Sequence, residues 1–86
     1  MRIEQIVWDL DSDPDGNVQH LAQHGVTIEE AEEILRNAEE VLASHSSGLP
    51  IVFGCTAAGK YLAVVFEIVD QVPLVVYPIT AYETEP

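Results

Sequence analysis

Hydrophobic residues recur along this chain with two spacings, which predict two helices and five strands. Between residues 14 and 37 the apolar positions fall three and four residues apart, as on one face of a helix. This spacing predicts helices over 14–24 and 28–37. Short apolar runs bounded by Gly, Pro, Asp or Ser predict strands elsewhere. The expected strands are 3–8, 41–45, 51–56, 61–69 and 74–80.

The junction between the two helices carries the clearest local signals. Thr27 and Glu30 have the spacing of a capping box, in which each side chain accepts a hydrogen bond from the backbone N–H of the other residue. Gly25 is the residue type found just after a helix, because it adopts positive φ without steric cost. Asp13 is the expected N-cap of the first helix, and Pro14 its first residue.

The strands differ in how apolar they are. Residues 61–66 are apolar on both faces, which is typical of a central strand. Gly59 fits the positive-φ position of the preceding hairpin loop. Pro78 has no N–H for a ladder, so the last strand is expected to lie at an edge, to contain a bulge or to end there. If 74–77 is an edge, its apolar side chains are candidates for an interface.

The order β-α-α-β-β-β-β predicts an α+β domain, with a mostly antiparallel sheet and two helices packed on one face. The 86 residues predict a single domain, 1–86, and the 48% hydrophobic content supports a globular fold. No apolar stretch approaches the ~20 residues of a membrane-spanning helix, and no signal peptide is evident. The lone Cys55 suits a reducing compartment and is expected to be buried in its strand. We therefore expect a cytoplasmic protein.

The net charge of the chain limits the partners that it can bind. Three basic residues stand against fifteen acidic ones, which gives a formal net charge of −12. Nucleic-acid affinity depends mainly on Lys and Arg contacts to phosphates, so nucleic acid is an unlikely partner. A field of this sign would attract and orient a basic protein.

Several short motifs follow one another along the chain. They are Trp8-Asp9, Asn17 with His20, His24-Gly25-Val26-Thr27, Glu29-Glu30-Ala31, Gly54-x-Thr56-x-x-Gly59-Lys60-x-Leu62-x-Val64-Val65-Phe66 and Ile79-Thr80-Ala81. In these motifs the chain resembles the BrnT family, the toxin component of type II toxin–antitoxin systems. The resemblance implies a RelE-like ribonuclease fold and an antitoxin as binding partner.

The sequence departs from that family at the basic positions. Lys60 stands where members of that family carry Arg after the hairpin glycine, and Tyr77 and Tyr82 stand where the resemblance leads us to expect arginines. RelE-like ribonucleases use such cations to hold the scissile phosphate. We therefore expect a non-catalytic BrnT-like domain that acts through a protein partner or self-association. The alternative is a ribonuclease with a rebuilt site, in which Lys60, Tyr77, Tyr82 and His20 take acid–base roles.

Neither a metal nor another cofactor is expected. Asp11, Asp13 and Asp15, followed by Gly16, match the first half of a calcium loop, and they remain the alternative metal ligands. The twelfth position of that loop is Ala22, however, where a bidentate Glu is required.

Two other side-chain patterns resemble functional sites. His20 and His24 have a metal-compatible spacing on one helix face, but no third ligand is evident. Cys55 has no obvious His partner and is not expected to act as a nucleophile.

Overall fold

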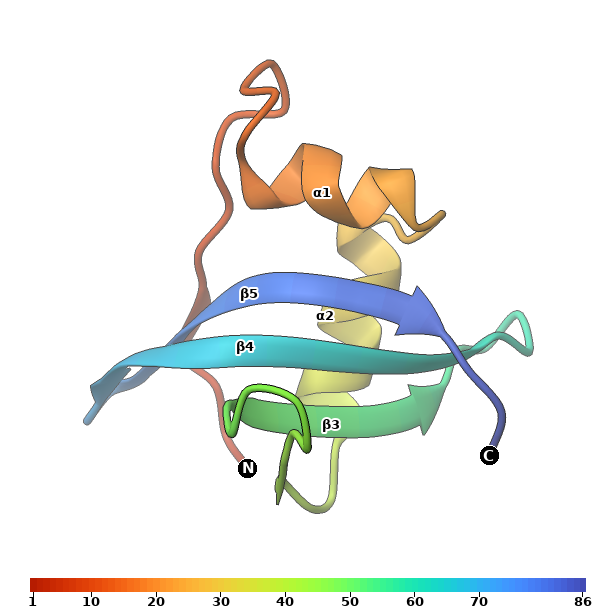
Figure 1. Cartoon of the computed structure of the whole chain (residues 1–86). Helices are drawn as coiled ribbons and strands as arrows, with labels where there is room; N and C mark the ends of the chain where they lie inside the picture. Colours follow the sequence, from red (N-terminus) through yellow and green to blue (C-terminus); the bar gives the residue numbers. More distant parts are fainter.

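A computed structural model describes residues 1–86 as two helices and one five-stranded sheet (Figure 1). The helices are α1 (Asn17–Gln23) and α2 (Ile28–Asn37). The strands are β1 (Gln5–Ile6), β2 (Leu42–Ala43), β3 (Pro50–Cys55), β4 (Tyr61–Gln71) and β5 (Leu74–Glu83). The predicted α+β class is confirmed. Neither helix combines the length and the apolar character that crossing a bilayer requires.

The strands lie in the order β1-β5-β4-β3-β2. The pairings β2–β3, β3–β4 and β4–β5 are antiparallel, whereas β1 runs parallel to β5. The sheet is therefore mixed, because β1 and β5 run in the same direction while every other neighbouring pair is antiparallel. β4 is the central strand, as predicted, and its residues 62–66 are all buried.

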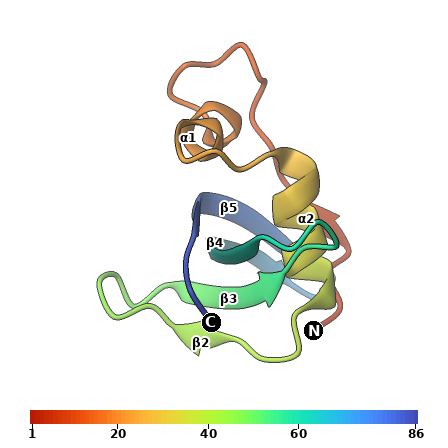
Figure 2. The same ribbon diagram turned by 90° about the vertical axis from the view of Figure 1, so that its right-hand side faces the viewer.

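β5 is not a free edge at 74–77, so this expectation is wrong. Gln5 and Ile6 pair with Val75 and Val76, which places β1 outside β5. Beyond this point α1 lies along β5, and the two figures agree on this placement (Figures 1 and 2). A helix over a strand edge blocks pairing with other chains.

Pro78 lies beside a bulge, one of the three alternatives that the sequence left open. In the β4–β5 ladder Phe66 pairs with Pro78 and Val65 pairs with Thr80, so Ile79 is an extra residue on β5. A bulge accommodates a residue that cannot donate to the ladder.

The two faces of the sheet are covered differently. Successive residues of a strand point to opposite faces. On one face α2 packs across β3 and β4 (Figure 2). Thirteen buried residues form the main core there; eleven come from the two helices and the strands, and Ile3 and Val26 come from the segments outside them. Phe66 and Leu35 are fully buried. On the other face only Ile51, Ala63 and Val65 form a buried cluster, with Leu49 against it. We call this second side the open face.

The first helix begins later than expected. It starts at Asn17, and its N-cap is Gly16 rather than Asp13. Asp13 instead accepts a hydrogen bond from the backbone N–H of Asp15 within the preceding turn. A Cβ on Gly16 would come within 2.7 Å of the Cβ of Asp9, so this close approach requires glycine. Tertiary contact with Asp9 thus overrides the local Asp-Pro signal.

Two other elements are shorter than expected. β1 covers only Gln5–Ile6 of the predicted 3–8, although the N–H groups of Glu4 and Val7 also bond to β5 carbonyls. β2 covers only Leu42–Ala43 of the predicted 41–45. Both are outer strands, each with a single neighbouring strand to define its length.

The turns between elements form as the sequence predicts. Thr27 and Glu30 make both hydrogen bonds of the capping box, at 3.1 and 3.0 Å. Gly25 and Gly59 have φ of 76° and 93°, as their turns require. The prediction that Cys55 is buried is wrong, because it ends β3 on the open face and its side chain is exposed.

Candidate functional site

Lys60 is held by groups of its own chain. Its Nζ donates to the backbone oxygen of Gly25 at 2.9 Å and lies 3.1 Å from Oε2 of Glu30. The pKa of Glu30 is lowered from its ordinary value, first by the hydrogen bond from the N–H of Thr27 and then by Lys60. The ion pair ties the β3–β4 hairpin to the start of α2 and neutralises the Lys60 charge locally.

A second polar cluster surrounds Asn17, whose exposure is only 3%. Its Nδ2 donates to the backbone oxygens of Val7 and Pro78, at 3.1 and 2.9 Å, and its Oδ1 accepts from the N–H of Asp9 at 2.9 Å. The N–H of Asn17 and the hydroxyl of Tyr77 both donate to Oδ2 of Asp9. We call these residues the Asn17 cluster; it joins the segment after β1, the start of α1 and β5.

The Asn17 cluster raises the pKa of Tyr77. The hydrogen bond to Asp9, assisted by burial and by the Asp9 charge, raises the pKa of Tyr77 to about 12. The same bond, with that from Asn17, lowers the pKa of Asp9. Tyr77 therefore keeps its proton near neutral pH and acts as a hydrogen-bond donor, not as a base.

The four alternative catalytic residues do not meet in one place. His20 and Tyr77 line a common hollow beside α1 and β5, where the acidic side chains are Asp15 and Glu67 and no Lys or Arg is present. Lys60 directly precedes β4 and its Nζ bonds to Glu30 at the start of α2, while Tyr82 lines a different hollow next to β2. His20 and Tyr77 therefore share one hollow, and Lys60 does not line it.

The alternative metal ligands are also not gathered. No group of three or more His, Cys, Asp or Glu side chains is arranged to hold a metal ion. The rings of His20 and His24 meet edge to face, with centroids 5.4 Å apart. The Asp-rich segment 11–15 forms turns before α1.

The open face carries aromatic side chains that the core does not absorb. Phe53 and Tyr82 are each 38% exposed, and each pairs with Ala63 of β4. The Phe53 ring also stacks on Tyr61, with centroids 6.4 Å apart and planes 15° apart. Leu42 of β2 is 47% exposed at the border of this face.

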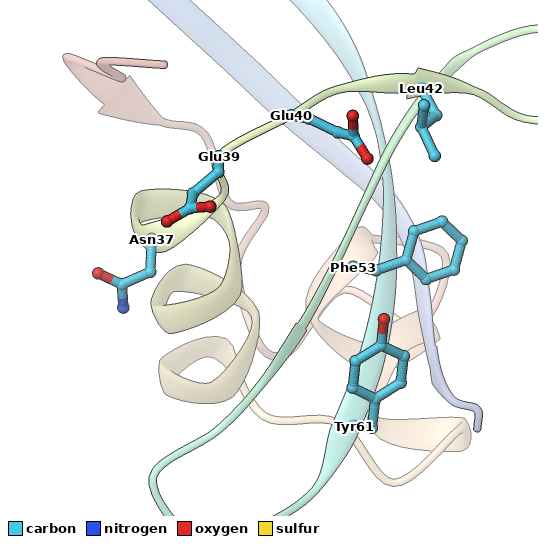
Figure 3. Close-up of a pocket in the computed structure, with 6 residues that line it drawn as sticks. All are labelled: Asn37, Glu39, Glu40, Leu42, Phe53 and Tyr61. Carbon is cyan, nitrogen blue, oxygen red and sulfur yellow. The ribbon is translucent and has the colours of Figure 1, made fainter. Parts of the chain in front are cut away.

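Two hollows adjoin here and share Leu42 and Phe53. The first, the acidic hollow, has a volume of about 750 Å³ and is also lined by Asn37, Glu39, Glu40 and Tyr61 (Figure 3). In Figure 3 the Glu40 side chain points toward the Phe53 ring, while Glu39 points toward Asn37. The second, the apolar hollow, has a volume of about 510 Å³; Ile51, His45 and Tyr82 are among its other lining residues. We call the two hollows together the open-face groove.

All three basic residues lie outside this groove. Nε of Arg2 lies 3.7 Å from Oε1 of Glu4, and Arg36 donates a hydrogen bond to the backbone oxygen of Ile3. Lys60 is paired with Glu30. The groove is therefore an apolar and aromatic surface; Glu39 and Glu40 are its acidic lining residues, and no lysine or arginine lines it.

Sequence reasoning missed both the groove and the Asn17 cluster. Asn17 appeared only as part of a motif, although a buried amide bonded to residues up to 61 positions away is what holds the cluster together. The alternation of Phe53 with buried Val52 was the available signal for an aromatic on the open face. Comparisons of the chain with protein-family models, with curated proteins and with solved structures gave no match.

Proposed function

We propose that this chain is a non-catalytic BrnT-like domain that works by binding a basic protein. The observation that carries the proposal is the position of Lys60. It is the one cation that the resemblance places at a ribonuclease site, and it is bonded to Glu30 and Gly25. A lysine neutralised in this way offers little fixed positive charge to a phosphodiester.

The net charge supports a protein partner over RNA. A chain with a formal charge of −12 repels polyphosphate at long range and attracts a basic surface. The partly exposed Phe53, Tyr82 and Leu42 add apolar area of the kind that interface centres contain.

The alternative, a ribonuclease with a rebuilt site, has one observation in its favour. His20 and Tyr77 line the same hollow, where a His can transfer protons and a protonated Tyr can donate one. The carboxylates of Asp15 and Glu67 line that hollow too. They would repel a phosphate, so we favour the binding function.

Expression in a bacterium separates the two functions. We expect normal growth and intact cellular RNA when the wild-type chain is induced, with no difference in a Lys60→Ala or His20→Ala variant. Purified protein should also leave a mixed-sequence RNA uncut. Growth arrest and RNA cleavage by the wild-type chain, abolished by Lys60→Ala or His20→Ala, would overturn the proposal and establish the ribonuclease.

The binding function needs a positive test as well. Proteins captured by the tagged chain from its native lysate would be identified, purified separately and mixed with it again. We expect a basic protein that forms a defined complex, and an affinity that falls as salt is added, because opposite charges attract the two partners. A complex only with an acidic protein would contradict the proposal.

A further inference from the structure

We propose that the open-face groove binds a partner segment that carries an arginine or lysine next to apolar side chains. This inference rests on the proposed function, since it names the surface and the partner chemistry of the same binding activity. Three features of the groove carry it: the stacked aromatic pair, the two carboxylates and the adjoining apolar hollow.

The aromatic pair and the carboxylates suit the cationic side chain. Phe53 and Tyr61 stack nearly parallel, and both line the acidic hollow with Glu39 and Glu40. A guanidinium packs flat on an aromatic face and bonds to a carboxylate at its edge. Glu40 and Phe53 line the same hollow, and Figure 3 shows the Glu40 side chain on the Phe53 side of its backbone.

The apolar hollow suits the neighbouring side chains of the same segment. It adjoins the acidic hollow across Leu42 and Phe53, and Ile51 and Tyr82 line it further along. Its volume, about 510 Å³, has room for a large aliphatic or aromatic side chain. A cation followed by apolar residues therefore matches the order of the two hollows.

Charge selects a different protein over a second copy of this chain. Two copies would each bring a formal charge of −12, and neither has a lysine or arginine at the groove. Bringing the two acidic borders together would leave Glu39 and Glu40 of each copy unpaired, which is unfavourable. A basic segment supplies the missing cations.

The test uses the whole chain and a short fluorescent peptide of alternating arginine and leucine. Amide chemical shifts measured by NMR should change around residues 39–43, 53, 61 and 82, and should stay constant at the hairpin tip, 69–73. Peptides with glutamate for arginine, or serine for leucine, should bind weakly. Shift changes spread over the whole acidic surface would overturn the groove as the site.

Matched variants separate the groove from the overall charge. Glu39→Gln with Glu40→Gln should weaken peptide binding about fivefold or more, through loss of the charge-assisted bonds. Asp11→Asn with Asp15→Asn removes the same number of charges from the turns before α1, and it should weaken binding less than about twofold. Equal effects of the two pairs would contradict the proposal.

Apolar variants test the second hollow. Phe53→Ser and Tyr82→Ser should each weaken binding by about tenfold, since aromatic anchors contribute most of the energy of such sites. Val69→Ser with Val72→Ser, at the exposed hairpin tip, is the control and should have no effect. Because Phe53 and Tyr82 are partly exposed, both variants should fold, which circular dichroism verifies; if one does not, the other decides.

Two further outcomes are informative. A dimer in solution that the Phe53→Ser variant disrupts would show that a second copy occupies the groove, and the proposal would be wrong. If a natural basic partner is found and binds all the groove variants as tightly as the wild-type chain, the groove inference fails while the proposed function stands. RNA cleavage by the wild-type chain would instead defeat the proposed function.

Discussion

The two phenylalanines of this chain lie on opposite faces of one sheet. Phe66, on central β4, faces the helices and has no exposed surface. Phe53, on neighbouring β3, faces away from them, is 38% exposed and stacks on Tyr61 beside two carboxylates. The same residue type thus builds the core on one face and offers a surface on the other, and the difference depends only on which way the strand directs it.

The comparison indicates that the helix-covered face stabilises the fold and that the open face is available for binding. The helix-covered face has thirteen residues in its main core cluster, whereas the open face has three. Natural domains expose a large apolar patch mainly where something binds it. We therefore expect changes on the covered face to affect folding, and changes on the open face to affect binding.

The largest expected effect is that of Phe66→Ala. Removing a fully buried phenylalanine leaves a cavity and should lower the free energy of unfolding by about 3 to 5 kcal/mol. Phe53→Ala, its match on the open face, should cost roughly 1 kcal/mol or less, because water already contacts much of its ring. Urea denaturation followed by circular dichroism measures both; equal losses would contradict the comparison.

Asn17→Ala should have the next largest effect. The variant leaves the N–H of Asp9 and the buried oxygen of Pro78 without a hydrogen-bond partner, and each unsatisfied buried group costs about 1 to 3 kcal/mol. Asn37→Ala is the matched control, since exposed Asn37 makes only one side-chain hydrogen bond, to Glu33, and should cost about 0.5 kcal/mol or less. If the two variants unfold at the same urea concentration, the Asn17 cluster is not holding α1 against the sheet.

Tyr77→Phe should change the pH dependence of stability. The pKa of Tyr77 is about 12 in the folded chain and 10.0 ordinarily, so above pH 10 the unfolded chain releases a proton that the folded chain keeps. Stability from this bond is therefore complete below pH 10 and is lost as pH rises toward 12. Between pH 10 and 12 the free energy of unfolding should fall more steeply with pH in the wild-type chain than in Tyr77→Phe. The difference in slope should stay below about 1.4 kcal/mol per pH unit, the limit for one proton, because solvent screens this half-buried pair.

The same variant also affects the stability of the chain in acid, where stability is lost as pH falls rather than as it rises. The pKa of Asp9 lies below its ordinary 3.8, first because of Tyr77. Its contribution is present above that pH and lost as the carboxylate is protonated below it. Tyr77→Phe should therefore flatten the acid side of the stability profile too. Unfolding midpoints measured across pH give both arms, and parallel wild-type and variant profiles would show that the hydrogen bond is not formed in solution.

The sequence was most informative where local chemistry decides the structure. The capping box of Thr27 and Glu30 and the positive φ of Gly25 and Gly59 depend on a few adjacent residues, and all were predicted correctly. The start of α1 was not, because Gly16 packs against Asp9. The parallel pairing of β1 with β5 joins opposite ends of the chain, so no local pattern revealed it.

The candidate site was less accessible to sequence reasoning. The resemblance to the BrnT family suggested Lys60, Tyr77, Tyr82 and His20 as a set, but their positions depend on pairings between segments far apart in the chain. The groove is formed by β2, β3, β4 and β5 together. Only the alternation along β3 indicated that Phe53 leaves the core, and nothing local placed Glu40 in the same hollow.

Added salt should produce the smallest effect, and it tests whether the acidic surface is a cost to the fold. With only three basic residues against fifteen acidic ones, most carboxylates repel one another. Screening by moderate NaCl should therefore raise the melting temperature, by up to about 5 °C.

A matched variant shows whether the gain comes from repulsion. Asp11→Asn with Asp15→Asn removes two negative charges that make no ion pair, so this variant should start from a higher melting temperature and gain less from salt. A melting temperature that falls with NaCl would mean that the ion pair of Lys60 with Glu30 outweighs the repulsion. In that case the carboxylates of the open-face groove would repel one another less than we suppose. The attraction of the groove for a basic segment would then also be weaker than the contrast between the two faces suggests.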